Sequence, residues 1–102
     1  MELKNTAMAG TLESSDVQIT IEPASGGISL SIDSSVLNQY GRQIKALALE
    51  TLDNLNINSA KVTIVDKGAL DCTIRARLEC AAYRAANFEG DIPWNTLGGS
   101  AK

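Results

Sequence analysis

The fold is decided by two stretches in which apolar and polar side chains alternate, Val17-Gln18-Ile19-Thr20-Ile21-Glu22 and Ile28-Ser29-Leu30-Ser31-Ile32-Asp33. An alternation of period two that is rich in β-branched residues is typical of strands with one buried face. The segment between them, Pro23-Ala24-Ser25-Gly26-Gly27, has a proline that cannot donate to a strand ladder and two glycines that tolerate positive φ. The sequence therefore predicts a hairpin whose apolar face packs on a core.

A helix is predicted next, because the apolar spacing changes from two to three or four after residue 34. The recurring positions are Val36, Tyr40, Ile44, Leu47, Thr51 and Leu55. Such a stripe is typical of an amphipathic helix, here over residues 35–54. Ser34 or Ser35 is expected to cap its first turn, and Asn54 and Asn56 suit its exit because asparagine tolerates the left-handed conformation.

Alternation resumes in the second half of the chain and predicts a second hairpin. Residues 61–65 and 70–78 are expected to be its strands, with Asp66-Lys67-Gly68 as the tight turn. An alanine-rich helix is expected over residues 79–87, and a loose C-terminal tail over residues 88–102. The predicted order is ββαββα. It indicates an α+β fold of two layers, in which a mainly antiparallel four-stranded sheet packs against one long helix.

A single small core suits a chain of 102 residues. Residues 1–16 show no sustained period and are expected to be a flexible N-terminal segment, so that the single α+β domain spans residues 17–87. The N-terminus lacks the pattern of a signal peptide, and no apolar run approaches the roughly 18 residues of a membrane span. A cytoplasmic protein that needs no membrane is therefore predicted.

Composition excludes several classes of function. Lys and Arg number 9 against 12 Asp and Glu, for a net charge of −3, so a basic face for nucleic acid is not expected. The chain has no histidine, which excludes a Ser-His-Asp triad, a Cys-His dyad and any histidine-based metal site within it. Cys72 and Cys80 lack partners at zinc spacing and are expected to be buried, reduced thiols. A carrier or an adaptor is favoured over a catalyst.

Three features are candidate sites. Glu13-Ser14-Ser15-Asp16 offers serine hydroxyls in a small, polar segment that a modifying enzyme can reach. Asp33-Ser34-Ser35-Val36 resembles the Asp-Ser-Leu of ordinary fatty-acid carrier proteins, but helix capping explains its serines. Arg75 and Arg77 would share one face of the predicted strand, where they could clamp a phosphate or a partner's carboxylate. The alternative for the first and third features is a solvated surface.

Several of these strings resemble the citrate lyase acyl carrier protein family. Ala9-Gly10-Thr11-Leu12-Glu13-Ser14-Ser15-Asp16-Val17 is similar to the opening of that family. Asp66-Lys67-Gly68-Ala69-Leu70, followed by Arg75-Ala76-Arg77, is similar to a later segment. The likeness extends over about residues 1–87, and the two longer strings are specific together.

The resemblance implies a function that fits the missing catalytic groups. The family's modified serine corresponds to Ser14, whose hydroxyl would carry 2′-(5″-triphosphoribosyl)-3′-dephospho-CoA through a phosphodiester; Ser15 is the neighbouring alternative. The thiol of this arm would carry acetyl and citryl thioesters between a transferase (alpha) and a lyase (beta) subunit, which cleave citrate to acetate and oxaloacetate. The expected partners are these two subunits and a prosthetic-group transferase. Arg75 and Arg77 are candidates for docking or for contact with phosphates of the arm.

Two other functions stay open at this point. The acyl carrier subunit of malonate decarboxylase bears the same kind of prosthetic group. Its pattern at this point is similar to Gly-Ser-Gly-Asp, whereas this chain has Glu13-Ser14-Ser15-Asp16. A non-modified adaptor domain would carry no group at all. The mass of protein isolated together with its native modifying enzymes distinguishes a carrier from an adaptor.

Overall fold

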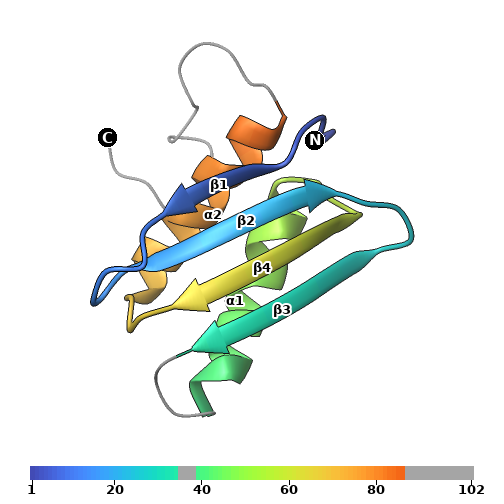
Figure 1. The fold of residues 1–102 in the computed structure, drawn as a ribbon. Coiled ribbons are helices and arrows are strands. Elements are labelled where there is room, and N and C mark those ends of the chain that lie inside the picture. Colours follow the sequence, from blue (N-terminus) through green and yellow to red (C-terminus); the bar gives the residue numbers. More distant parts are fainter. Residues whose placement is uncertain (35–38, 87–102) are drawn as a thin grey trace.

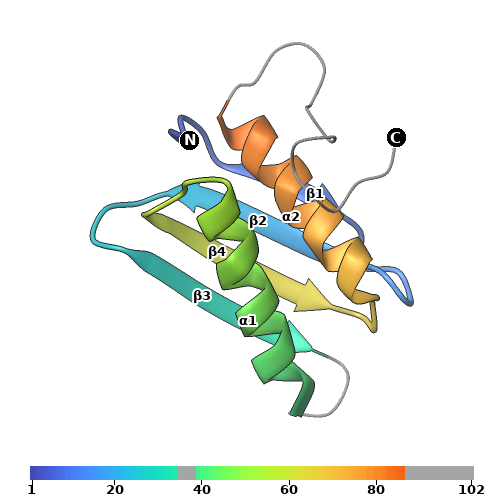
Figure 2. The same cartoon turned by 180° about the vertical axis from the view of Figure 1, so that it is seen from behind.

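The computed structural model describes residues 1–34 and 39–86, and Figure 1 shows their arrangement. In chain order the elements are β1 (Ala7–Gly10), β2 (Val17–Pro23), β3 (Ile28–Ser34), α1 (Gln39–Asn54), β4 (Ala60–Asp66) and α2 (Asp71–Ala85). Both helices cover the same face of a four-stranded sheet, as Figure 2 shows from behind. The α+β class, the two layers and the number of strands are as predicted. The order of elements is βββαβα instead of ββαββα.

The sheet is mixed, and its strands lie in the order β1-β2-β4-β3. β2 pairs antiparallel with both β1 and β4, whereas β3 pairs parallel with β4. The predicted hairpin between β2 and β3 is therefore wrong, because β4 lies between them. The physical reason is the helix: α1 connects β3 to β4 across one face of the sheet, and such a crossover places the second strand parallel to the first.

The predicted strand over residues 70–78 is wrong as well, because these residues begin α2. The alternation of apolar residues there includes Ile74 and Leu78, which are four apart and also satisfy a helical period. The buried positions continue at that period through Ala81, Ala82 and Ala85. The sheet thus packs against two helices of similar length, 16 and 15 residues, and not against one long helix.

The N-terminal segment contains a strand that the sequence pattern did not predict. β1 lies within residues 1–16 and forms one edge of the sheet beside β2. The backbone N–H groups of Lys4 and Asn5 donate to the carbonyl oxygen of Ala85, at 2.8 and 2.9 Å. Residues 7–10 therefore belong to the same layer as the strands of the predicted domain. The predicted tail, residues 88–102, lies outside the described residues.

The core forms where the inner face of the sheet meets the helices. Val17, Ile19 and Ile21 of β2 are fully buried, as predicted from their alternation, and Figure 2 shows α2 over this strand. α1 ends as predicted: Asn56 has a φ of 58°, and the N–H of Ile57 donates to the carbonyl of Leu52 at 2.9 Å. The first predicted residues of this helix, 35–38, lie outside the described part of the chain.

The two cysteines are free, as predicted, but they are less buried than predicted. Cys72 is exposed on α2 and Cys80 is half-buried.

Neither of the two helices described between residues 39 and 86 is long and apolar enough to cross a bilayer.

Candidate functional site

Ser14 lies in the connection between β1 and β2, residues 11–16, which we name the Ser14 turn. This turn lies at the same end of the molecule as the connection from β4 to α2 (Figure 1). Two backbone hydrogen bonds join the connections: the N–H of Ser15 donates to the carbonyl of Lys67 at 2.8 Å, and the N–H of Lys67 donates to the carbonyl of Asp16 at 2.9 Å. Ser14 is exposed, as predicted, and its backbone lies between residues that the rest of the fold holds in place.

Two residues of unusual backbone conformation bracket the serine. Gly10 ends β1 with a φ of +91°, and a Cβ at this position would lie 1.8 Å from the carbonyl oxygen of Val17. Only glycine fits this close approach of the two strands. Ser15 has a φ of 66°, which is uncommon for a residue with a side chain. A glycine at this position would adopt the same conformation without strain.

The carboxylate of Asp16 is the centre of the polar contacts around the turn. Its Oδ2 accepts the hydroxyl of Thr11 at 2.7 Å, and its Oδ1 accepts the backbone N–H of Val17 at 2.7 Å. Arg77 of α2 donates to both oxygens, through Nε to Oδ1 and through Nη2 to Oδ2, each at 3.2 Å. These contacts hold the pKa of Asp16 at about 2, with the Thr11 hydroxyl and the Val17 N–H contributing before the guanidinium.

The two candidate arginines do not share a face, because they lie on a helix and not on a strand. Residues two apart on a helix point about 200° apart. Arg77 reaches the Ser14 turn through Asp16, whereas Arg75 acts electrostatically on Glu79 of the same helix. Glu79 is 5% exposed, and burial raises the pKa of its carboxyl while the positive charge of Arg75 opposes that rise. The prediction that Arg75 and Arg77 share one face and clamp a group together is therefore wrong.

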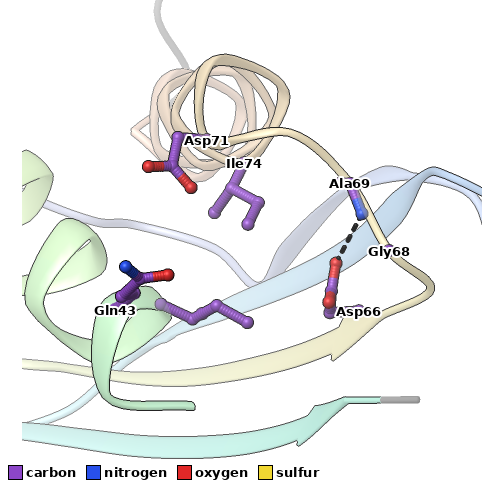
Figure 3. Close-up of a pocket in the computed structure, with 7 residues that line it drawn as sticks. Gln43, Asp66, Gly68, Ala69, Asp71 and Ile74 are labelled. Atoms are coloured by element: carbon purple, nitrogen blue, oxygen red, sulfur yellow. Dashed lines mark hydrogen bonds between the residues drawn. The ribbon is translucent and has the colours of Figure 1, made fainter. Parts of the chain in front are cut away.

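A second polar cluster lies at the same end of the sheet, around Asp66 (Figure 3). Asp66 is 2% exposed; it accepts the hydroxyl of Ser34 and the backbone N–H of Ala69, both at 2.9 Å. A cavity of about 260 Å³ opens beside it, lined by Gln43, Ile44, Asp66, Gly68, Ala69, Asp71 and Ile74. Ser34 thus bonds a carboxylate at the end of β3. No group of His, Cys, Asp and Glu within residues 1–34 and 39–86 is arranged to hold a metal ion.

The arrangement provides an accessible hydroxyl at Ser14. Within the described part of the chain, no hydrogen bond involves the Ser14 side chain, and both oxygens of Asp16 are engaged elsewhere. Ser14 is therefore accessible, and none of the residues in 1–34 and 39–86 bonds its hydroxyl. The sequence pattern did not predict that Asp16 connects Thr11 to Arg77. The only signal was an Asp placed directly before a strand.

Comparisons with known proteins cover most of the chain. The family model described as "Malonate decarboxylase delta subunit (MdcD)" matches residues 4–85, which include β1, the Ser14 turn and α2. A citrate lyase acyl carrier protein of Oenococcus oeni is 50% identical over 95% of this chain and 100% of its own length. One of Streptococcus equi subsp. zooepidemicus is 57% identical over 87% of this chain and 88% of its own length. One of Vibrio cholerae is 50% identical over 95% and 99%.

A solved structure confirms the fold. A chain in the crystal structure of a Pseudomonas malonate decarboxylase hetero-tetramer in complex with malonate superposes with a TM-score of 0.71, at 25% identity, over 80% of this chain and 84% of that chain. The sequence identity of this chain to the citrate lyase relatives is thus about twice its identity to the malonate decarboxylase chain. These relatives are named as acyl carrier proteins, which are carrier subunits and not catalysts. The chain belongs to the citrate lyase acyl carrier protein family.

Proposed function

We propose that this chain is the acyl carrier subunit of citrate lyase and that Ser14 carries its prosthetic group. The donor of this group, before it is attached, is 2′-(5″-triphosphoribosyl)-3′-dephospho-CoA. Membership of the family supports the carrier role. The observation that supports Ser14 is its exposed hydroxyl on a turn that the rest of the fold holds in place. The neighbouring Ser15 is exposed as well, and its backbone N–H donates to the carbonyl of Lys67.

The residues of the turn fit such a group. The Ser14 Oγ would hold the group through a phosphodiester to the phosphorus nearest the ribose, and the other two phosphates of the triphosphate would leave as pyrophosphate. The hydroxyl proton passes to a base of the attaching enzyme, because the carboxylate of Asp16 is already saturated with donors. When attached, the group supplies a thiol that carries acyl groups as thioesters in the conversion of citrate to acetate and oxaloacetate.

This chain contributes a rigid anchor for the group. The β1–β2 connection, which contains Ser14, lies at one end of the molecule (Figure 1). Tethering would give the carried acyl group a high effective concentration at each partner's active site. The proposed partners are the alpha and beta subunits and the prosthetic-group transferase, in the cytoplasm. The malonate decarboxylase hetero-tetramer, which contains a chain of this fold, supports assembly into a multi-subunit complex.

The two arginines are proposed to act separately in docking or in phosphate contact. Arg77 keeps Nη1 free of Asp16 and is 43% exposed, so it has donors to offer to a phosphate next to Ser14. Arg75 is half-exposed and lines a shallow groove between α1 and α2 together with Asp71 and Glu50. A docking role of Arg75 would therefore involve the helical face, away from the sheet.

A reconstitution experiment tests the proposal. The chain is co-expressed with the enzymes that make and attach the group, and then combined with the alpha and beta subunits in a citrate-cleavage assay. Ser14→Ala is expected to remove cleavage completely, whereas Ser15→Gly, which suits a φ of 66°, is expected to retain it. Cleavage supported by the Ser14→Ala protein contradicts the assignment of the site. Replacing the partners with malonate decarboxylase subunits tests the second candidate, which the shared fold supports.

A further inference from the structure

We propose that Asp16 and Arg77 are positioning residues, which hold the Ser14 turn in the conformation that the attaching enzyme requires. This inference rests on the proposed function and adds to it a role for the hydrogen bonds that hold the Ser14 turn. It assigns neither residue to the chemical step. Their role is to fix where the Ser14 hydroxyl lies before the enzyme binds.

The first observation is that Asp16 joins three separate parts of the chain. Through its carboxylate it bonds Thr11 at the start of the turn, Val17 at the start of β2, and Arg77 on α2. Asp16 and Arg77 are 61 residues apart in sequence. A local turn without α2 would keep the first two bonds and lose the third, so the folded domain contributes directly to the shape around Ser14.

The second observation is that the backbone on each side of Ser14 is bonded. The N–H of Glu13 donates to the Thr11 hydroxyl at 3.2 Å, and the carbonyl of Glu13 accepts the N–H of Asp16 at 3.1 Å. The N–H of Ser15 donates to Lys67 at 2.8 Å. The Thr11 hydroxyl therefore has two roles at once, since it accepts from Glu13 and donates to Asp16. Loss of this hydroxyl would release both contacts.

The third observation is that Asp16 has no capacity left to act on Ser14 as a base. Each of its two oxygens accepts two hydrogen bonds. A carboxylate that is fully engaged and only 15% exposed serves as a structural anchor for the turn. Because misplacing a reacting group by about 1 Å can cost about 100-fold in rate, an anchor two residues from the nucleophile affects attachment without touching the reacting atoms.

The test measures attachment kinetics on the full-length chain with purified transferase and its prosthetic-group donor, followed by intact mass. Arg77→Gln and Thr11→Val are each expected to lower kcat/KM of attachment by about 10- to 100-fold. Thr11→Ser keeps the hydroxyl and is expected to retain the wild-type rate. Because the turn and not the overall fold is disturbed, the far-ultraviolet circular dichroism of all variants should match wild type.

The matched control is Arg84→Gln. Arg84 lies on the same helix and also bonds the β1–β2 pair, through Nη1 to the carbonyl of Met8 at 2.7 Å, but away from the Ser14 turn. Its loss is expected to lower stability by a similar amount and to leave attachment unchanged. Wild-type rates for both Arg77→Gln and Thr11→Val overturn the inference, as does an equal loss in Arg84→Gln. A wild-type chain that is not modified at Ser14 overturns the proposed function itself, and this inference with it.

Discussion

The guanidinium of Arg77 lies side-on to the carboxylate of Asp16, with Nε 3.2 Å from Oδ1 and Nη2 3.2 Å from Oδ2. This contact connects α2 to a turn that carries an exposed serine two residues earlier in the chain. Bidentate pairs of this kind fix direction as well as distance. The surface of α2 is thus part of the site, although every residue of the turn comes from the N-terminal sixteen.

Removal of the Ser14 hydroxyl is expected to separate function from stability. Ser14→Ala should change the free energy of unfolding by no more than about 0.5 kcal/mol, because the side chain is exposed and accepts no hydrogen bond within the described residues. Urea unfolding followed by circular dichroism measures this change. A large loss of stability shows that Ser14 is structural and contradicts the account of an accessible attachment point.

Substitution of Gly10 is expected to be severe. Gly10→Ala places a Cβ 1.8 Å from the Val17 carbonyl oxygen at a φ of +91°, so the strand pair next to the Ser14 turn must separate. We expect a loss on the order of 3 kcal/mol or more, from left-handed strain and overpacking together. Thermal unfolding measures it.

Gly26→Ala is the matched control for backbone strain. Gly26 has a φ of +88°, but nothing lies within 4 Å of the added Cβ. Its substitution is expected to cost only about 1–2 kcal/mol, from the left-handed conformation alone. Equal losses for the two glycine variants contradict the close approach of Gly10 to β2.

The ionised Asp16 is expected to contribute stability that acid removes. Its pKa is lowered from 3.8 to about 2 in the folded chain, chiefly by the Thr11 hydroxyl and the Val17 N–H. The unfolded chain therefore binds this proton first as the pH falls, so the contribution is complete above about pH 4 and is lost between about pH 4 and pH 2. Unfolding in urea at several pH values measures this loss, and Asp16→Asn should show a shallower decline. Parallel pH profiles for the two proteins contradict the prediction.

The buried Glu79 is expected to have the opposite effect. Burial raises the pKa of its carboxyl above the ordinary 4.5, with Arg75 only partly opposing it, so the ionised form disfavours the folded state at neutral pH. Glu79→Gln should raise the melting temperature at pH 7, and this advantage should fade as the pH falls through the raised pKa and be gone at about 4.5. Glu50→Gln, at an exposed position on α1, is the control. A lower melting temperature of Glu79→Gln at pH 7 shows that the charge is stabilising.

The strands β2, β3 and β4 and the end of α1 could be predicted from the sequence because each has one clear period. The segment from Leu70 to Leu78 could not, since apolar residues at every second position include pairs four apart, such as Ile74 and Leu78. Tertiary packing decides between the two periods here. The small buried side chains of Ala81, Ala82 and Ala85 let α2 lie close to β1 and β2.

β1 was missed for a related reason. Its sequence, Ala7-Met8-Ala9-Gly10, has neither β-branched residues nor a long alternation, so only its pairing with β2 makes it a strand. The same limit applies to the site. Ser14 is predictable from the string around it, whereas the contact of Asp16 with Arg77 depends on α2 being a helix. On the strand that the alternation predicts, Arg77 would point to the same side as Arg75.

The most direct test of the account is the mass of the chain isolated from cells that express the complete citrate lyase system. We predict an intact mass increased by the phosphoribosyl-dephospho-CoA group, with peptide fragmentation that places the whole increase on Ser14. The same increase on Ser15 contradicts the assignment of the site to Ser14. An unmodified chain from these cells contradicts the carrier function proposed for it.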